Sequence, residues 1–148
     1  MVLVPGSIFV LLLGCPALVA KAPVDREGLL SLADLEAAIT DEAAVVSLMW
    51  ANNETGVLFP VEQIAEICQS RGVLYHCDAV QAAGKVEIDV RKIPADYLSL
   101  TGHKFHALKG IGALYVRRKS PPGPQFMGTS RPQSTGNTQC ILRGAAAG

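Results

Sequence analysis

Apolar runs and amphipathic helices alternate along the middle of this 148-residue chain. Helices are expected after Ser31, which can cap a first turn, and between Pro60 and Gly72. Strand, helix, strand at this spacing predicts a parallel or mixed α/β sheet with right-handed crossovers and helices on both faces, hence three layers. The runs of strand-forming residues lie at 44–50, 73–79, 97–101 and 113–118. We expect these strands to be apolar on both faces, as a sheet covered by helices requires.

The two ends of the chain differ in composition from its middle. All 13 Asp and Glu residues lie between positions 25 and 96. The start is almost purely apolar, whereas the end is rich in Gly, Pro, Ser, Thr and Gln, a composition typical of loops or disorder. We therefore expect an atypical apolar N-terminal segment at 1–23, an α/β domain at 24–119 and an irregular or disordered tail at 120–148.

The apolar start leaves more than one interpretation open. Its run at 8–20 is short for a membrane span and has the length of a signal-peptide hydrophobic region, but no Lys or Arg precedes it. The Leu12-Leu13-Gly14-Cys15 string resembles a lipoprotein box only loosely. A secreted or lipid-anchored binding module is one alternative, and a buried strand or an atypical chain start is the simpler one. We expect a cytoplasmic protein without membrane attachment.

Charge and cysteine usage exclude several classes of function. Lys plus Arg (13) equals Asp plus Glu (13), so no basic excess points to nucleic-acid binding. The four cysteines, at 15, 68, 77 and 140, form no CxxC pair and lack zinc-site spacing, so no metal site is expected. Cys68 on an apolar helix face and Cys77 in a strand are expected to be buried thiols.

Polar side chains follow three of the predicted strands. Asn53 comes after the first, Asp78 and Gln81 lie at the end of the second, and His103 and Lys104 follow the third. In open α/β sheets, ligands bind outside the carboxyl ends of the strands. The sequence therefore predicts one site at this edge of the sheet.

Asp78 and Lys104 suggest the chemistry of that site. A carboxylate in an apolar strand needs a partner, and a structural salt bridge to Lys104 is one alternative. The other is a pyridoxal phosphate site, in which the Asp holds the protonated ring nitrogen and the Lys forms an imine. Asn53 and Gln81 can then donate to the phenolate oxygen of the cofactor, and Thr101 to its phosphate.

Three strings in this order support the second alternative: ANNETG at 51–56, YHCDAVQAAGK at 75–85 and TGHKFHALKGIGALYVRR at 101–118. Through them the chain resembles the cysteine desulfurases of the nitrogen-fixation type, which are pyridoxal-phosphate enzymes of the class V aminotransferase group. The resemblance covers about residues 24–119 and includes the spacing from Asp78 to Lys104. It implies part of the large domain of a type I pyridoxal-phosphate transferase.

The resemblance also implies roles. Lys104 would be the Schiff-base lysine and the group that moves protons at the substrate α-carbon, while His103 would join Thr101 at the phosphate. His76 matches a family histidine to which we assign no role. The implied reaction converts L-cysteine to L-alanine in a homodimer, with the sulfur passing as a persulfide to an acceptor or iron–sulfur scaffold protein. The implied cofactor-binding residues are Asn53, Asp78, Gln81, Thr101, His103 and Lys104.

Other parts of the chain depart from the family pattern. The cofactor-stacking histidine would fall near Val2, and the Gly-rich, Arg-containing stretch that should begin near Pro121 is replaced. The sulfur-accepting cysteine belongs to a C-terminal domain, and Cys140 is not assigned that role. We therefore expect a truncated cysteine desulfurase that is inactive alone. A selenocysteine lyase, another class V aminotransferase and a non-enzymatic remnant remain alternatives.

Overall fold

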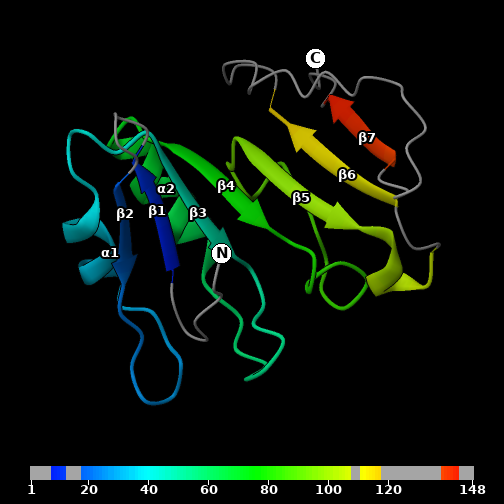
Figure 1. The fold of residues 1–148 in the computed structure, drawn as a ribbon, viewed down its shortest axis with the longest axis horizontal. Coiled ribbons are helices and arrows are strands. Elements are labelled where there is room, and N and C mark those ends of the chain that lie inside the picture. Colours follow the sequence, from blue (N-terminus) through cyan, green and yellow to red (C-terminus); the bar gives the residue numbers. More distant parts are fainter. Residues whose placement is uncertain (1–7, 13–17, 108–110, 118–137, 144–148) are drawn as a thin grey trace.

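The computed structural model describes residues 8–12, 18–107, 111–117 and 138–143. These residues form a seven-stranded sheet in the order β2-β1-β3-β4-β5-β6-β7 (Figure 1). The strands are β1 (Ile8–Leu12), β2 (Leu18–Ala22), β3 (Val45–Met49), β4 (Leu74–Asp78), β5 (Tyr97–Thr101), β6 (Ile111–Val116) and β7 (Thr138–Arg143). The helices are α1 (Leu32–Ala38), α2 (Val61–Ser70) and the 3₁₀ helix η1 (Gly102–Phe105).

The sheet is mixed, which confirms the predicted α/β class. Strands β3, β4 and β5 are parallel, with Ser47 opposite His76 and Asp78 opposite Ser99. Strand β6 is antiparallel to β5 and parallel to β7, and β1 is antiparallel to both β2 and β3. The carboxyl ends of the three parallel strands therefore meet at one edge, where the candidate site was expected.

Both helices begin where the sequence predicts, and α2 also ends there. The Ser31 hydroxyl accepts a hydrogen bond of 3.2 Å from the Asp34 N–H at the start of α1. Helix α2 follows Pro60 and ends before Gly72, whose φ of +67° suits the position after a helix. A salt bridge of 3.0 Å joins Glu36 of α1 to Arg71 at the end of α2, so the two helices lie side by side on one face of the sheet.

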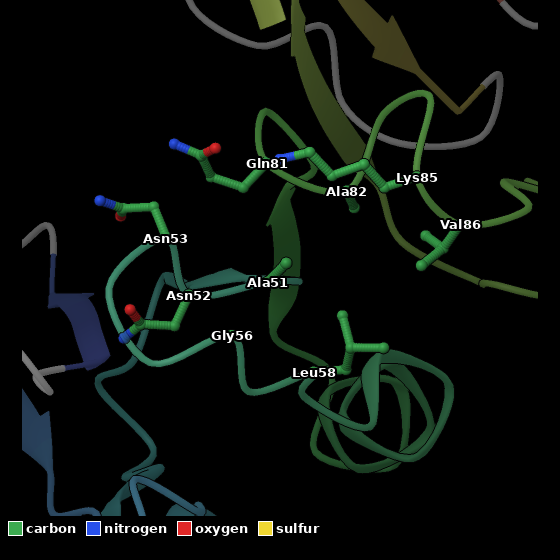
Figure 2. Close-up of a pocket in the computed structure, with 9 residues that line it drawn as sticks. All are labelled: Ala51, Asn52, Asn53, Gly56, Leu58, Gln81, Ala82, Lys85 and Val86. Atoms are coloured by element: carbon green, nitrogen blue, oxygen red, sulfur yellow. The ribbon is translucent and has the colours of Figure 1, made fainter. Parts of the chain in front are cut away.

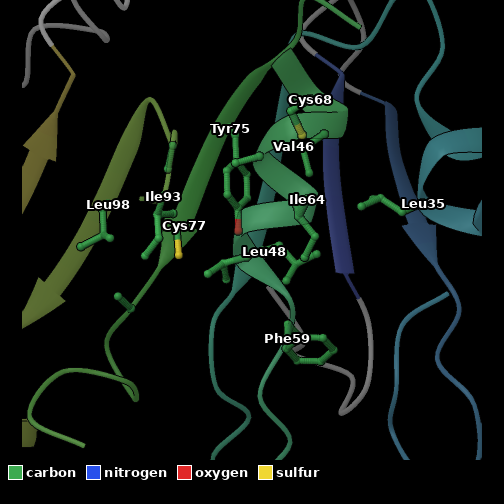
Figure 3. Close-up of a cluster of buried hydrophobic side chains, with 14 of the residues drawn as sticks. Leu35, Val46, Leu48, Phe59, Ile64, Cys68, Tyr75, Cys77, Ile93 and Leu98 are labelled. Carbon is green, nitrogen blue, oxygen red and sulfur yellow. The ribbon is translucent and has the colours of Figure 1, made fainter. Parts of the chain in front are cut away.

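The hydrophobic core lies between these helices and the sheet (Figure 3). Alternate residues of β3, β4 and β5 point into it, because side chains alternate between the faces of a strand. Among the described residues, helices cover this face only, so they show two of the three expected layers. The opposite face is half-buried and partly polar, unlike the expected strands with two apolar faces. The largest fully buried core side chains are Tyr75, Leu35, Leu48, Ile64, Leu98, Val46, Cys68 and Cys77.

The described parts of both chain ends are strands. Residues 8–12 and 18–22 form an antiparallel pair, in agreement with the strand interpretation of the apolar start. Residues 138–143 form β7, which differs from the irregular tail that we expected. The apolar Cys140-Ile141-Leu142 run is short, and it forms a strand by pairing with β6, the strand that precedes it in the chain. Residues 118–137 and 144–148 lie outside the described residues, so the three-segment division stays a prediction.

No helix in the described part of the chain is long and apolar enough to cross a membrane. The loose lipoprotein string around Cys15 lies mostly outside the described residues.

Candidate functional site

The loop after β3 presents Asn53 at its exposed tip. Its neighbour Asn52 shapes the loop, since the Asn52 carboxamide oxygen accepts hydrogen bonds from the N–H groups of Glu54 (2.8 Å) and Thr55 (3.2 Å). The Asn52 backbone adds a bond to Val57 O of 2.9 Å. Sequence reasoning placed Asn52 and Asn53 together after the first strand but gave a role to Asn53 alone, although an Asn before a turn is a common sign of this side-chain bond. The Asn53 amide makes no hydrogen bond within the described residues.

Asp78 is the last residue of β4 and is partly buried. Its Oδ1 accepts a hydrogen bond of 2.9 Å from the Val80 N–H, which fixes the carboxylate at the edge of the sheet. Within the described residues Oδ2 has no hydrogen-bond or salt-bridge partner. The alternative of an Asp78–Lys104 salt bridge is therefore not observed in this part of the chain, and one carboxylate oxygen is free to accept a proton donor.

Asn53 and Gln81, both predicted to bind the phenolic oxygen, line the same hollow. It measures about 230 Å³ and lies between the loop after β3 and the loop after β4 (Figure 2). Lys85, which sequence reasoning did not select, also lines it. Asp78, Thr101, His103 and Lys104 are not among the lining residues. The hollow thus brings together the two amide side chains of the predicted site, Asn53 and Gln81.

Thr101 and His103, both predicted to contact the phosphate, contact each other. The Thr101 Oγ1 lies 3.0 Å from the His103 Nδ1, at the junction of β5 and η1. Thr101 is on the same face of the sheet as Asp78, because Asp78 is opposite Ser99 and side chains two residues apart share a face. The Lys104 side chain is exposed in η1, where an aldehyde can reach its amine.

The loop after β4 also touches η1, a contact that the sequence did not indicate. Gly84 has a φ of +75°, and a Cβ at this position would come within 3.1 Å of the Phe105 Cβ. Phe105 follows Lys104 directly in η1. Close packing at Gly84 therefore ties the loop that carries Gln81 to the turn that carries Lys104.

Sequence reasoning also missed a polar network on the open face of the sheet. The His76 Nδ1 lies 2.8 Å from the Ser47 Oγ, and its Nε2 lies 3.2 Å from the Ser99 Oγ. Burial lowers the pKa of His76, and the nearby Asp78 charge partly opposes that shift. The signal was available, since each of these residues is a polar side chain in an otherwise apolar strand.

The cysteine expectations can be compared with the structure at two positions. Cys68 and Cys77 are free and buried, as predicted. Among the described residues, no group of three or more His, Cys, Asp and Glu side chains is placed to hold a metal ion.

The chemistry of these side chains fits pyridoxal phosphate. Asp78 offers a free carboxylate oxygen to a protonated ring nitrogen, and Asn53 and Gln81 offer amides to an oxygen anion. Lys104 offers an accessible amine. These groups come from the ends of three adjacent strands.

A comparison with protein families gives a match over most of the chain. The family model for class V aminotransferases matches residues 14–136. The chain belongs to the class V aminotransferase family. The match extends beyond both ends of the region in which the sequence motifs lie, so it includes part of the apolar start and part of the tail.

Named relatives place the chain among homologues of the cysteine desulfurases. The cysteine desulfurase NifS of Azotobacter vinelandii is 51% identical over 110 residues, which are 74% of this chain and 27% of the relative. The desulfurase of Klebsiella pneumoniae is 49% identical over 108 residues, 73% of this chain and again 27% of the relative. This class V aminotransferase chain thus spans about a quarter of the length of these relatives.

A solved structure described as a NifS-like protein matches the fold with a TM-score of 0.69 and 37% identity. The match covers 85% of this class V aminotransferase chain and 33% of that structure. It confirms that the observed sheet corresponds to part of a desulfurase-like fold.

Proposed function

We propose that this chain carries the pyridoxal-phosphate centre of a cysteine desulfurase and holds the cofactor covalently at Lys104. The observation that carries the proposal is the position of the Asp78 carboxylate. It ends the middle strand of the parallel set, with one oxygen held by the Val80 N–H and the other without a partner in the described residues. A carboxylate so placed suits a protonated pyridine nitrogen.

The other side chains then have distinct tasks. Asn53 and Gln81 donate from their shared hollow to the phenolic oxygen, while Thr101 and His103 bind the phosphate. The Lys104 amine would hold the cofactor through its aldehyde carbon, with loss of water, and would hold or return the proton of the substrate α-carbon. When bound, pyridoxal phosphate supplies an electron-withdrawing ring that eases bond breaking at that carbon.

The substrate and partners follow from the named relatives and are part of the proposal. We take L-cysteine as the substrate, with L-alanine and sulfur for an acceptor or iron–sulfur scaffold protein as products. We also take a homodimer and a cytoplasmic location. Selenocysteine is the second candidate substrate, because no described residue distinguishes sulfur from selenium. Since the 148 residues span only 27% of the Azotobacter relative, we expect weak cofactor binding and no turnover from this chain alone.

Cofactor capture is the direct test. The purified chain mixed with pyridoxal phosphate is expected to show a new absorption band, and borohydride reduction should leave the cofactor's mass on the peptide containing Lys104. Lys104→Ala should abolish both signals. Lys92→Ala serves as the matched control, because Lys92 is also exposed but lies outside the candidate site.

Labelling of Lys92 or Lys85 in place of Lys104 would contradict the proposal. An assay of alanine release from cysteine tests the second part. Release faster than with free pyridoxal phosphate would show that the chain is active alone, contrary to our expectation.

A further inference from the structure

Three polar side chains form a row across the open face of the sheet. His76 of β4 lies between Ser47 of β3 and Ser99 of β5, at 2.8 Å and 3.2 Å from the two hydroxyl oxygens. Each ring nitrogen therefore has its own hydroxyl partner. Because a hydroxyl can both donate and accept, the two serines satisfy a neutral imidazole, which has one donor and one acceptor nitrogen. The network fixes the orientation of the ring from both sides.

The surroundings of His76 favour the neutral ring. Burial is the main influence on its pKa and lowers it, with the Asp78 carboxylate acting in the opposite direction. Asp78, two residues along the same strand, is the charged side chain that β4 brings to this face. Among the described residues, the side chains that β3 and β5 bring to this face beside it are uncharged at neutral pH: Val45, Ser47, Met49, Tyr97 and Ser99.

This arrangement determines which groups can bind the Asp78 carboxylate. The imidazole nitrogens are occupied by Ser47 and Ser99, so His76 does not use the carboxylate as its partner. A protonated His76 on the same face would be a cation competing for the carboxylate. A neutral ring leaves the free Oδ2 available for another donor.

We infer that His76 is a positioning residue of the cofactor site, held by Ser47 and Ser99 so that Asp78 remains free for the ring nitrogen of a pyridine ligand. The inference rests on the proposed function. His76 acts through Asp78 and does not itself contact the ligand.

The first experiment measures binding of pyridoxine 5′-phosphate, which has the ring and the phosphate but no aldehyde and so needs no covalent bond to Lys104. The double variant Ser47→Ala/Ser99→Ala is expected to bind about tenfold more weakly, as the loss of two hydrogen bonds allows. In an Asp78→Asn background the same two changes should cause no further loss, because they act through Asp78. Ser70→Ala is the matched control, since this exposed serine bonds only to Ile67 O at the end of α2.

Three binding results would overturn the inference: unchanged affinity in the double variant, an equal loss in the Asp78→Asn background, or no binding by the unaltered chain. Thermal melting checks that each variant is folded. If the double variant does not fold, Ser47→Ala and Ser99→Ala are tested singly, with a smaller loss expected from each.

The second experiment needs no ligand. Nitrogen NMR of the cofactor-free chain, with His76 assigned from His76→Gln, should show a neutral imidazole in one tautomer at neutral pH. The double serine variant should show a mixture of tautomers. A cationic ring in the unaltered chain would overturn the inference even if Lys104 captures pyridoxal phosphate. Conversely, binding of pyridoxine phosphate without capture at Lys104 would contradict the proposed function alone.

Discussion

At the residue scale, we expect the candidate site to be most sensitive to the addition of a single methyl group at Gly84. Its φ of +75° disfavours a side chain, and a Cβ there would meet the Phe105 Cβ at 3.1 Å. Gly72 has a similar φ of +67° at the end of α2, but a Cβ there would meet nothing within 4 Å. The two glycines therefore separate backbone strain from contact with η1.

We expect Gly72→Ala to lose about 1 kcal/mol of the free energy of unfolding from the left-handed backbone, and Gly84→Ala to lose more, because its methyl group also meets the Phe105 Cβ. Only Gly84→Ala should also slow the capture of pyridoxal phosphate at Lys104, because the new methyl group pushes on Phe105. Urea unfolding and borohydride trapping measure the two effects. Equal trapping by both variants would show that the contact has no influence on the lysine.

At the element scale, Arg117 at the end of β6 forms hydrogen bonds with the segment between β4 and β5. Its guanidinium donates to the carbonyl oxygens of Ala95 and Ile93, both at 2.9 Å, and to that of Val90 at 3.5 Å. The Asp96 carboxylate accepts a further hydrogen bond of 2.9 Å from the Tyr75 N–H. These bonds hold the chain where it enters β5, the strand that leads to Thr101 and Lys104.

Replacing Arg117 by Met keeps the aliphatic stem but removes the donors to those carbonyl oxygens. We expect the free energy of unfolding to fall by about 2 kcal/mol, with a smaller fall for Arg117→Lys. Arg91→Met is the control, because Arg91 is exposed and pairs only with Asp89, two residues away. Chemical unfolding of the three variants gives the comparison. A loss as large in Arg91→Met would exclude a specific role for the carbonyl contacts.

The sequence predicted the elements better than the contacts between them. Local patterns were enough for α1, α2 and the parallel strands, since Ser31, Pro60 and Gly72 act within one turn of the helix ends. Strand β7 was missed because its apolar run, Cys140-Ile141-Leu142, is short and lies in a tail rich in Gly, Pro, Ser and Thr. The contact between Gly84 and Phe105 was missed because it joins the loop after β4 to η1 and no local pattern indicates it.

The candidate site also has parts that the sequence predicted and parts that it did not. The family resemblance predicted that Thr101 and His103 lie together, and the parallel strand order predicted that Asn53 lies close to Gln81. The row through His76 was missed because its strands were interpreted as apolar on both faces. Period-two alternation separates the polar face from the core face in these strands.

At the scale of the whole molecule, one hydrophobic core joins helix α2 to the central strands. Two cysteine thiols lie in this core, so their reactivity measures whether the core is closed. Cys68 of α2 and Cys77 of β4 are buried, and burial raises the pKa of each to about 12. Because the thiolate is the reactive form, a raised pKa and a closed core both slow modification at about pH 8.

In a Cys15→Ser/Cys140→Ser background, we expect no reaction of the folded chain with Ellman's reagent at about pH 8. On addition of denaturant, Cys68 and Cys77 should become reactive together, because they share one cooperative core. Absorbance measures the number of thiols, and peptide mapping separates them. Rapid reaction of one thiol in native buffer would instead show that α2 or β4 opens by itself.

The order of strands across the sheet has a consequence for how the molecule forms. From β3 to β7, spatial order equals chain order, so each strand pairs with the one synthesised just before it. The sheet can therefore grow at one edge as the chain leaves the ribosome, because each of β4, β5 and β6 is added beside the strand that precedes it in the chain. Because η1 follows β5 in the chain, Lys104 is synthesised after β4 and β5, the strands whose ends carry Asp78 and Thr101.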